Sequence, residues 1–268
     1  TYTIKYVTTY SSQSLCPDSS TSTITITDAP SAKFTYPGKF CNNEVNQLPI
    51  FPSGSSAGEF TAKPAGLVFA NPSTGEINVK ASTPGTYMVI NIIKAGGGGA
   101  EAKDSFEVTI KPVPVVTVPV DFEVCNNVTV PVTNFSSTPA GATFAWTNTN
   151  SSIGIAASGS GQIAAFAALN PGTAPVTATI SVVPTLDACD GVAASYVITV
   201  NPTPLVTQTA DVTVCNGDTI PAISFSSTTS GTDFSWSNSN IAIGLAASGN
   251  GPIASFKATN TSNAVISA

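Results

Sequence analysis

The chain has 268 residues, of which 42% are hydrophobic and only 9% are charged, and it has a net charge of −6 and no histidine. A charged fraction so far below the roughly 25% of ordinary soluble domains argues against a nucleic-acid partner, because no basic patch can form. The abundant Thr, Ser, Val and Ile suit half-buried strands better than helices. The composition therefore predicts an all-β fold with turns at the 21 Gly and 20 Pro residues.

Residues 1–28 are predicted to be the last strands of a module that begins before Thr1. Tyr2, Ile4 and Tyr6 alternate with other residues, as in a strand with one buried face. The segment has a counterpart downstream, since Thr1–Ile4 is similar to Thr86–Val89 and Thr23–Ile26 is similar to Glu107–Ile110. The sequence begins within a strand-like run and stops within another at Ala268. We therefore expect it to be an internal segment of a longer chain.

The next two parts of the chain are predicted to be complete modules. Residues 29–112 contain turn signals at Asn71–Gly75 and Ser82–Gly85, which bracket an expected strand at Glu76–Lys80. Residues 113–203 form a second type of module, whose last strand again alternates apolar and polar residues.

An internal repeat defines the remaining module. Residues 121–178 align with residues 211–268 without a gap at an offset of 90, and half of the aligned positions are identical. A period of about 90 residues matches an immunoglobulin-like sandwich and is too long for one turn of a solenoid. Residues 204–268 are therefore predicted to be the first two-thirds of another module.

Proline-rich segments join the modules at Asp28–Pro30, Lys111–Pro114 and Asn201–Pro204. Proline fixes φ and disfavours helix in the preceding residue, so these linkers are expected to be short, extended and stiff. The modules should follow one another head to tail as a rod, each with its neighbours in the chain as partners. Apolar stretches are short and broken by proline, so no membrane span is expected.

Several sequence blocks in residues 121–203 resemble the PKD-like modules that occur in tandem in secreted and surface proteins of Bacteroidota. The blocks are Val124–Asn126, Phe144–Asn148, Ile153–Gly161, Ala178–Ile180 and Tyr196–Pro202, and residues 211–268 repeat the first three. Residues 29–112 look like a companion repeat of the same proteins, marked by Pro64–Leu67, Thr74–Ile77 and Pro84–Tyr87.

This resemblance implies Greek-key β-sandwich modules of about seven strands, export from the cell, and an extracellular or cell-surface location. Such arrays occur in giant gliding-motility adhesins similar to SprB and in other cargo of the type IX secretion system. The resemblance brings no catalytic residues and no cofactor. The chain departs from the acidic core motif of PKD domains, because Thr147 and Asn148 follow Trp146.

Single, scattered cysteines fit structural disulfides formed in an oxidising compartment. Cys125 and Cys189 lie in one module, and a bridge between them would close a loop of about 65 residues, worth about 4 kcal/mol. By the repeat, Cys215 is expected to pair with a cysteine beyond Ala268, and Cys16 with one before Thr1. Cys41 is either a free buried thiol or the partner of Cys16, and the sequence favours the free thiol.

Trp146 and Trp236 occupy equivalent positions, and core packing is the preferred interpretation over a sugar-stacking surface. Without histidine, no Cys–His or Ser–His nucleophile is available. The carboxylates are few and dispersed, so neither a metal site nor a glycosidase pair is expected. Asp218–Ile220 resembles the O-glycosylation acceptor motif of Bacteroidota, which makes Thr219 a candidate for modification.

The sequence thus favours a non-catalytic, repetitive extracellular adhesin or stalk, whose modules act as spacers and as candidate binding units for surface polysaccharide or another surface protein. Two alternatives stay open. The modules could be spacers in a secreted multidomain enzyme, or subunits of an extracellular filament that assembles through donated strands.

Overall fold

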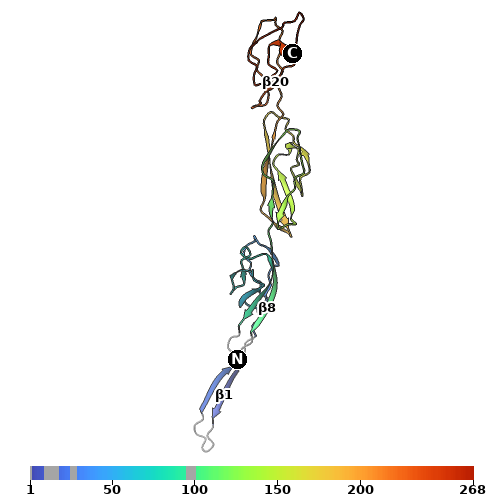
Figure 1. Ribbon diagram of the computed structural model, residues 1–268. Helices are drawn as coiled ribbons and strands as arrows, with labels where there is room; N and C mark the ends of the chain where they lie inside the picture. The colour runs from blue at the N-terminus through green and yellow to red at the C-terminus, as the bar shows by residue number, and fades with distance from the viewer. Residues whose placement is uncertain (1, 9–17, 25–28, 95–100) are drawn as a thin grey trace, which may run out of the picture. The chain divides into compact units, whose positions relative to one another are not determined.

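The computed structural model describes residues 2–8, 18–24, 29–94 and 101–268. Its regular structure within these ranges consists of strands and two 3-10 turns, η1 (Ser151–Ile153) and η2 (Ile241–Ile243), without an α-helix. The chain divides into two compact units, Thr1–Val113 and Pro114–Ala268. Figure 1 shows that strands make up the regular structure of both units, and most of their strand pairs are antiparallel. The predicted all-β sandwich fold is confirmed.

The first unit holds a four-stranded sheet in the order β3-β8-β7-β4. A separate hairpin, β1–β2, precedes this sheet in the sequence, and a short pair, β5–β6, accompanies it. The strands are β1 (Tyr2–Thr8), β2 (Asp18–Ile24), β3 (Lys39–Cys41), β4 (Glu59–Lys63), β5 (Phe69–Asn71), β6 (Glu76–Ile77), β7 (Gly85–Ile93) and β8 (Ala102–Lys111).

The antiparallel pair β7–β8 forms the centre of this sheet. Tyr87 and Val89 of β7, and Val108 and Ile110 of β8, point to one face and are 3% exposed or less. The period of two in these strands produces this buried face. It packs against an aromatic cluster made of Phe34, Tyr36, Phe40 and Phe60.

A buried amide ties the loops of the first unit to β7. Asn91 is fully buried, and its Nδ2 donates hydrogen bonds to the carbonyl oxygens of Ala32 and Ser56, both at 2.9 Å. Its Oδ1 accepts a hydrogen bond from the Gly58 N–H at 2.8 Å. The three hydrogen bonds satisfy the amide, which would otherwise be costly to bury.

The second unit contains a sheet in the order β10-β18-β16-β13-β14, with β17 paired to β16. Two short pairs, β9–β12 and β11–β15, accompany it. The strands are β9 (Val115–Thr117), β10 (Phe122–Cys125), β11 (Thr129–Val130), β12 (Ser136–Thr138), β13 (Thr143–Asn148), β14 (Ser158–Ser160), β15 (Phe166–Ala167), β16 (Val176–Leu186), β17 (Cys189–Asp190) and β18 (Ala194–Asn201).

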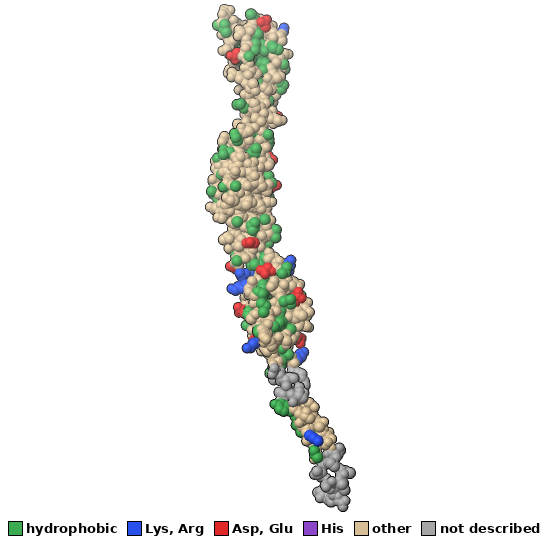
Figure 2. All heavy atoms as spheres, turned by 180° about the vertical axis from the view of Figure 1, so that it is seen from behind, with side chains coloured by type: hydrophobic (Ala, Val, Ile, Leu, Met, Phe, Trp, Pro, Cys, Tyr) green, Lys and Arg blue, Asp and Glu red, His purple; other side chains and the backbone are tan. Residues whose placement is uncertain are grey.

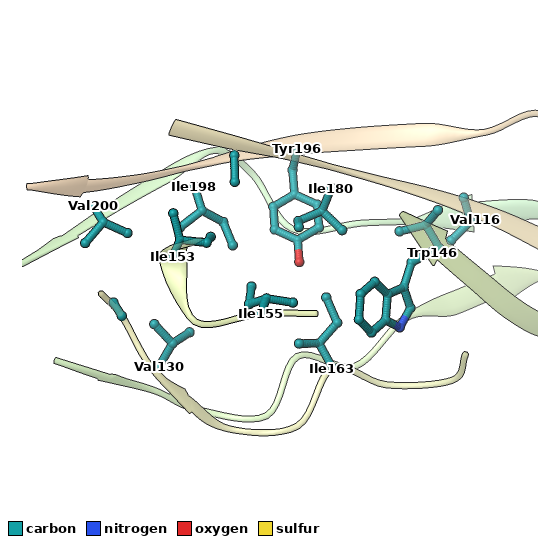
Figure 3. Packing of buried hydrophobic residues seen from close by; sticks show 13 residues of the cluster. Val116, Val130, Trp146, Ile153, Ile155, Ile163, Ile180, Tyr196, Ile198 and Val200 are labelled. Carbon is teal, nitrogen blue, oxygen red and sulfur yellow. The ribbon is translucent and has the colours of Figure 1, made fainter. Parts of the chain in front are cut away.

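Figure 3 shows the core of this module, where side chains from β16 and β18 meet those from the opposite layer. Ile180 and Ile198 point inward from the central pair, and Ile153 and Ile163 face them from the other side. All four are 3% exposed or less. Alternation along β16 and β18 therefore buries one face of the sheet, as the sequence pattern predicts.

Residues 204–268 reproduce the first part of this module. Two strand pairs form, β19–β22 and β20–β21, and η2 takes the place of η1. In both turns an asparagine, Asn150 or Asn240, caps the start, and Gly154 or Gly244 caps the end with a positive φ. The strands are β19 (Thr219–Ile220), β20 (Ser235–Ser237), β21 (Ser248–Asn250) and β22 (Phe256–Lys257).

We predict that Asn91→Ala lowers the free energy of unfolding of the first unit by about 2 to 4 kcal/mol, because it leaves one donor and two acceptors buried without partners. Urea unfolding followed by circular dichroism would measure the loss. Met88→Ala is the matched control, since Met88 lies on the same strand and is 42% exposed. Equal midpoints for the two variants would contradict the role given to Asn91.

Candidate functional site

Charged side chains are sparse and unevenly distributed. Residues 1–113 contain eight acidic and eight basic residues, whereas residues 114–268 contain seven acidic residues and one lysine, Lys257. Figure 2 shows the resulting surface, where uncharged polar atoms predominate over most of the visible face. Among the described residues, no three His, Cys, Asp or Glu side chains gather as a metal site. The features that remain as candidates for chemistry or binding are therefore the cysteines, the tryptophans, Thr219 and an open groove in residues 204–268.

The cysteines differ in whether they are disulfide-bonded or free thiols. Cys41 and Cys189 are disulfide-bonded, whereas Cys125 and Cys215 carry free, exposed thiols. The predicted Cys125–Cys189 bridge is therefore wrong.

The register of the sheet explains why this bridge does not form. Cys125 pairs with Asn201 at the end of β18, whereas Cys189 pairs with Leu186 in the hairpin that precedes the start of β18. The eight residues of β18 separate the two cysteines by about 23 Å, at about 3.3 Å per residue. A disulfide requires Cα atoms closer than about 7 Å.

Cys41 has the position in the first unit that Cys125 has in the second. Each ends a short strand that runs parallel to the last strand of its module, and Cys41 pairs with Lys111 as Cys125 pairs with Asn201. The expectation that Cys41 is a free thiol is wrong, because it is disulfide-bonded. Cys16, the alternative partner, lies outside the described residues.

Trp146 belongs to the core of the second unit and is 8% exposed. It pairs across the sheet with Gly159 of β14, and a Cβ on that glycine would lie 2.2 Å from the indole Cζ2. The ring thus covers the glycine, and only a residue without a side chain fits beneath it. Its Nε1 is buried without a hydrogen-bond partner, so the ring serves packing and is not available for sugar stacking.

Trp236 repeats this arrangement in the last part of the chain. It pairs with Gly249 of β21, whose Cβ would lie 2.4 Å from the indole Cζ2. Its Nε1 is also buried without a partner, but the side chain as a whole is half-buried.

Thr219 begins β19, is exposed, and pairs with Lys257 of β22. The preceding Asp218 has a local structural role, because its Oδ2 accepts a hydrogen bond from the Cys215 N–H at 2.8 Å. An exposed hydroxyl is compatible with modification, which stays a prediction.

The open groove lies where residues 204–268 differ from the module that they repeat. It has a volume of about 380 Å³ and is lined by Val212–Asn216, Ile220, Ile243, Ala258–Asn260 and Val265–Ala268. In the preceding module, β16 and β18 cover the equivalent residues.

Two asparagines of the second unit, Asn148 and Asn170, are buried, and the side-chain pattern of the sequence did not predict their burial. The Nδ2 of Asn148 donates to Ile155 O at 3.1 Å, and the Nδ2 of Asn170 donates to Val200 O at 2.7 Å. The repeat contained a signal for both, since Asn238 and Asn260 stand at the equivalent positions. An asparagine that recurs at the same position in two copies of a module indicates that the loop it bonds to has the same geometry in both.

Neither a protein-family model nor a curated protein matches the chain. Among solved structures, the fibronectin(III)-like modules of Clostridium thermocellum CbhA are 11% identical, with 63% of this chain and 95% of that chain covered and a TM-score of 0.29. The human Desmocollin-1 ectodomain is 12% identical, with 96% and 61% covered and a TM-score of 0.34. Extracellular domains 3–5 of Drosophila OTK are 12% identical, with 87% and 91% covered and a TM-score of 0.31.

The chain thus spans less than two thirds of the desmocollin chain. Similarity at this level assigns neither an activity nor a ligand. No helix in the described ranges is long and apolar enough to cross a membrane.

We predict that Gly159→Ala destabilises the second unit by about 1 to 3 kcal/mol, because the new methyl group must displace the Trp146 ring. Tryptophan fluorescence during urea unfolding, measured in a Trp236→Phe background, reports on this ring alone. Ser160→Ala on the same strand is the matched control, since Ser160 is exposed. A Gly159→Ala variant as stable as the control would show that the indole does not pack as described.

We also predict that a thiol reagent labels Cys125 and Cys215 in the native, unreduced chain, whereas Cys41 and Cys189 react only after reduction. The cause is covalent, since a disulfide sulfur offers no thiolate to the reagent. Mass spectrometry of tagged peptides measures each site separately. Labelling of Cys189 before reduction, or protection of Cys125, would contradict the assignment.

Proposed function

We propose that this chain is a segment of a repetitive, non-catalytic extracellular adhesin or stalk, in which successive β-sandwich modules hold a terminal element away from a surface. One observation carries the proposal: the first part of one module is built a second time in succession, and several of its loop hydrogen bonds are repeated. An enzyme needs one constellation of reactive groups, whereas a spacer needs copies of a stable unit.

The duplicated hydrogen bonds concern the loops that hold each module in shape. Asn170 N–H donates to Asn126 Oδ1 at 2.8 Å, and Asn260 N–H donates to Asn216 Oδ1 at 2.9 Å. The side-chain amides also match, because Asn170 and Asn260 each donate through Nδ2 to a carbonyl four residues later at 2.9 Å. Loops and core are therefore repeated together.

Surface composition and disulfides support a location outside the cell. Disulfide-bonded Cys41 and Cys189 fit an oxidising compartment. Between Lys111 and Lys257 the sequence has neither Lys nor Arg, so a trypsin-like protease finds no cleavage site there. A rod exposed to secreted proteases benefits from this surface.

The resemblance to PKD-like modules supplies the finer part of the proposal. It points to a Bacteroidota surface protein, exported by type IX secretion and related to gliding-motility adhesins similar to SprB. Partners would be the neighbouring modules of the same chain and, for a terminal module, surface polysaccharide or another surface protein.

Two other functions use the same modules. A spacer array in a secreted enzyme would place the catalytic domain outside residues 1–268. A filament subunit would assemble through strands donated between chains.

Fluorescent antibody raised against residues 113–203 and applied to living, unpermeabilised source cells tests the proposal. We expect label on the cell surface, because a stalk stays attached to the cell that presents it. Label found only in the culture medium would reject the stalk and favour the secreted spacer. An antibody against a cytoplasmic protein controls for broken cells.

A further inference from the structure

Two short linkers each contain one residue whose φ is not fixed by a proline ring. Residues 112–114 read Pro-Val-Pro, and residues 202–204 read Pro-Thr-Pro. A proline ring fixes its own φ near about −65° and restricts the residue before it to extended conformations. The remaining torsional freedom of each linker is therefore concentrated at Val113 and at Thr203.

Val113 is held by a side chain of its own module. The N–H of Asn42, the residue that follows β3, donates a hydrogen bond to Lys111 O at 3.0 Å. The Oδ1 of Asn42 accepts a hydrogen bond from the Val113 N–H at 3.2 Å. Proline has no N–H, so residues 112–114 have a single backbone donor. That donor is used to tie the linker to the end of β3.

Asn126 has the same place in the second type of module and holds Thr203. It follows β10, and its N–H donates to Asn201 O at 2.8 Å. Its Nδ2 donates to Thr203 Oγ1 at 3.2 Å. Both asparagines thus bond to the last residue of the module's last strand and to the residue two positions further on. An asparagine amide can serve both linkers, because it has an acceptor oxygen and a donor nitrogen.

A tight turn holds each asparagine at this place. In the first module the N–H of Glu44 donates to Cys41 O at 2.9 Å. In the second the N–H of Val128 donates to Cys125 O at 3.1 Å. The asparagine is the second residue of both turns, so its backbone is fixed by contacts that do not involve the linker. Two modules of different type therefore share one arrangement at the point where the chain leaves them.

We propose that Asn42 and Asn126 are positioning residues that lock the two linkers, so that the chain leaves each module in a fixed direction. The inference rests on the proposed stalk function and deepens it, since a spacer holds its terminal element away from a surface only if its linkers resist bending. The lock at Val113 uses the amide as an acceptor, whereas the lock at Thr203 uses it as a donor. One and the same substitution should therefore have opposite effects at the two linkers.

The test measures the order parameters of the Val113 and Thr203 amides in the 268-residue chain by nitrogen-15 relaxation. We expect both to be about 0.85, the value of rigid backbone. Asn42→Ala should lower the value at Val113 to below about 0.6, because the N–H loses its acceptor. Asn42→Asp should leave it unchanged, since a carboxylate oxygen still accepts the hydrogen bond.

The same substitution should release the second linker. At pH 7, Asn126→Asp should lower the order parameter of Thr203 to below about 0.6, because a carboxylate has no N–H to donate to Oγ1. The carboxylate still accepts the Asn170 N–H that Asn126 Oδ1 binds in the module. Thr203→Val should have the same effect from the linker side. Asn134→Ala is the matched control at both linkers, since Asn134 is exposed.

Thermal unfolding separates a lock from a contact that only stabilises the fold. We expect melting temperatures within about 2 °C of the unsubstituted chain for Asn42→Asp and Thr203→Val. Unchanged order parameters in Asn42→Ala and Thr203→Val would overturn the proposal, as would equal effects of aspartate at both linkers. Rigid linkers in a protein that antibody finds only in the culture medium would reject the stalk and keep the locks. Mobile linkers in a protein found on the cell surface would reject the locks alone.

Discussion

The antiparallel pair at the centre of each complete sandwich is the interaction on which the rest of the architecture depends. β7–β8 and β16–β18 each place a row of apolar side chains against the opposite layer, and in β7 the buried Asn91 continues this row. The short first strand of each sandwich, β3 or β10, runs parallel to the second strand of that pair. Burial of apolar side chains and hydrogen bonding between strands thus stabilise the same pair, and the sheet needs both.

Residues 211–268 align with residues 121–178, so they include counterparts of β10 to β15 but only the start of a counterpart of β16. The turn, the caps and the tryptophan–glycine pair all form, because each depends on contacts close in sequence. Residues 212–215, the counterparts of β10, form no strand, and the repeated segment does not extend to a counterpart of β18, with which β10 pairs. Local sequence therefore builds the loops, and the long-range pair builds the sheet.

Buried amides give these modules a fixed geometry that apolar packing alone does not provide. Asn91 and Asn170 bond to backbone groups that are distant in sequence, at Ala32 and Val200, whereas Asn148 bonds to the nearby turn at Ile155. An apolar core tolerates small shifts, whereas a buried amide is stable only where its partners are in place. Modules that must be copied many times with the same shape gain from such contacts.

Much of the fold was predictable from the sequence, because it rests on short-range pattern. The alternation of Tyr196, Ile198 and Val200 identified a half-buried strand, and the 90-residue repeat identified a second copy of the module. The core position of Trp146 followed from its place in such an alternating run, and the structure places it there. These properties depend on side-chain period, which the sequence displays directly.

The state of the cysteines was decided only by the tertiary structure. Cys125 and Cys189 belong to one module, but the parallel pairing of β10 with the far end of β18 holds them at opposite ends of the sheet. The buried role of Asn91 likewise depends on loops that approach it from Ala32 and Ser56. The sequence by itself determined which residues form strands and which faces they bury, whereas only the folded chain decided which distant groups meet, because strand register and direction are set by pairing across the whole module.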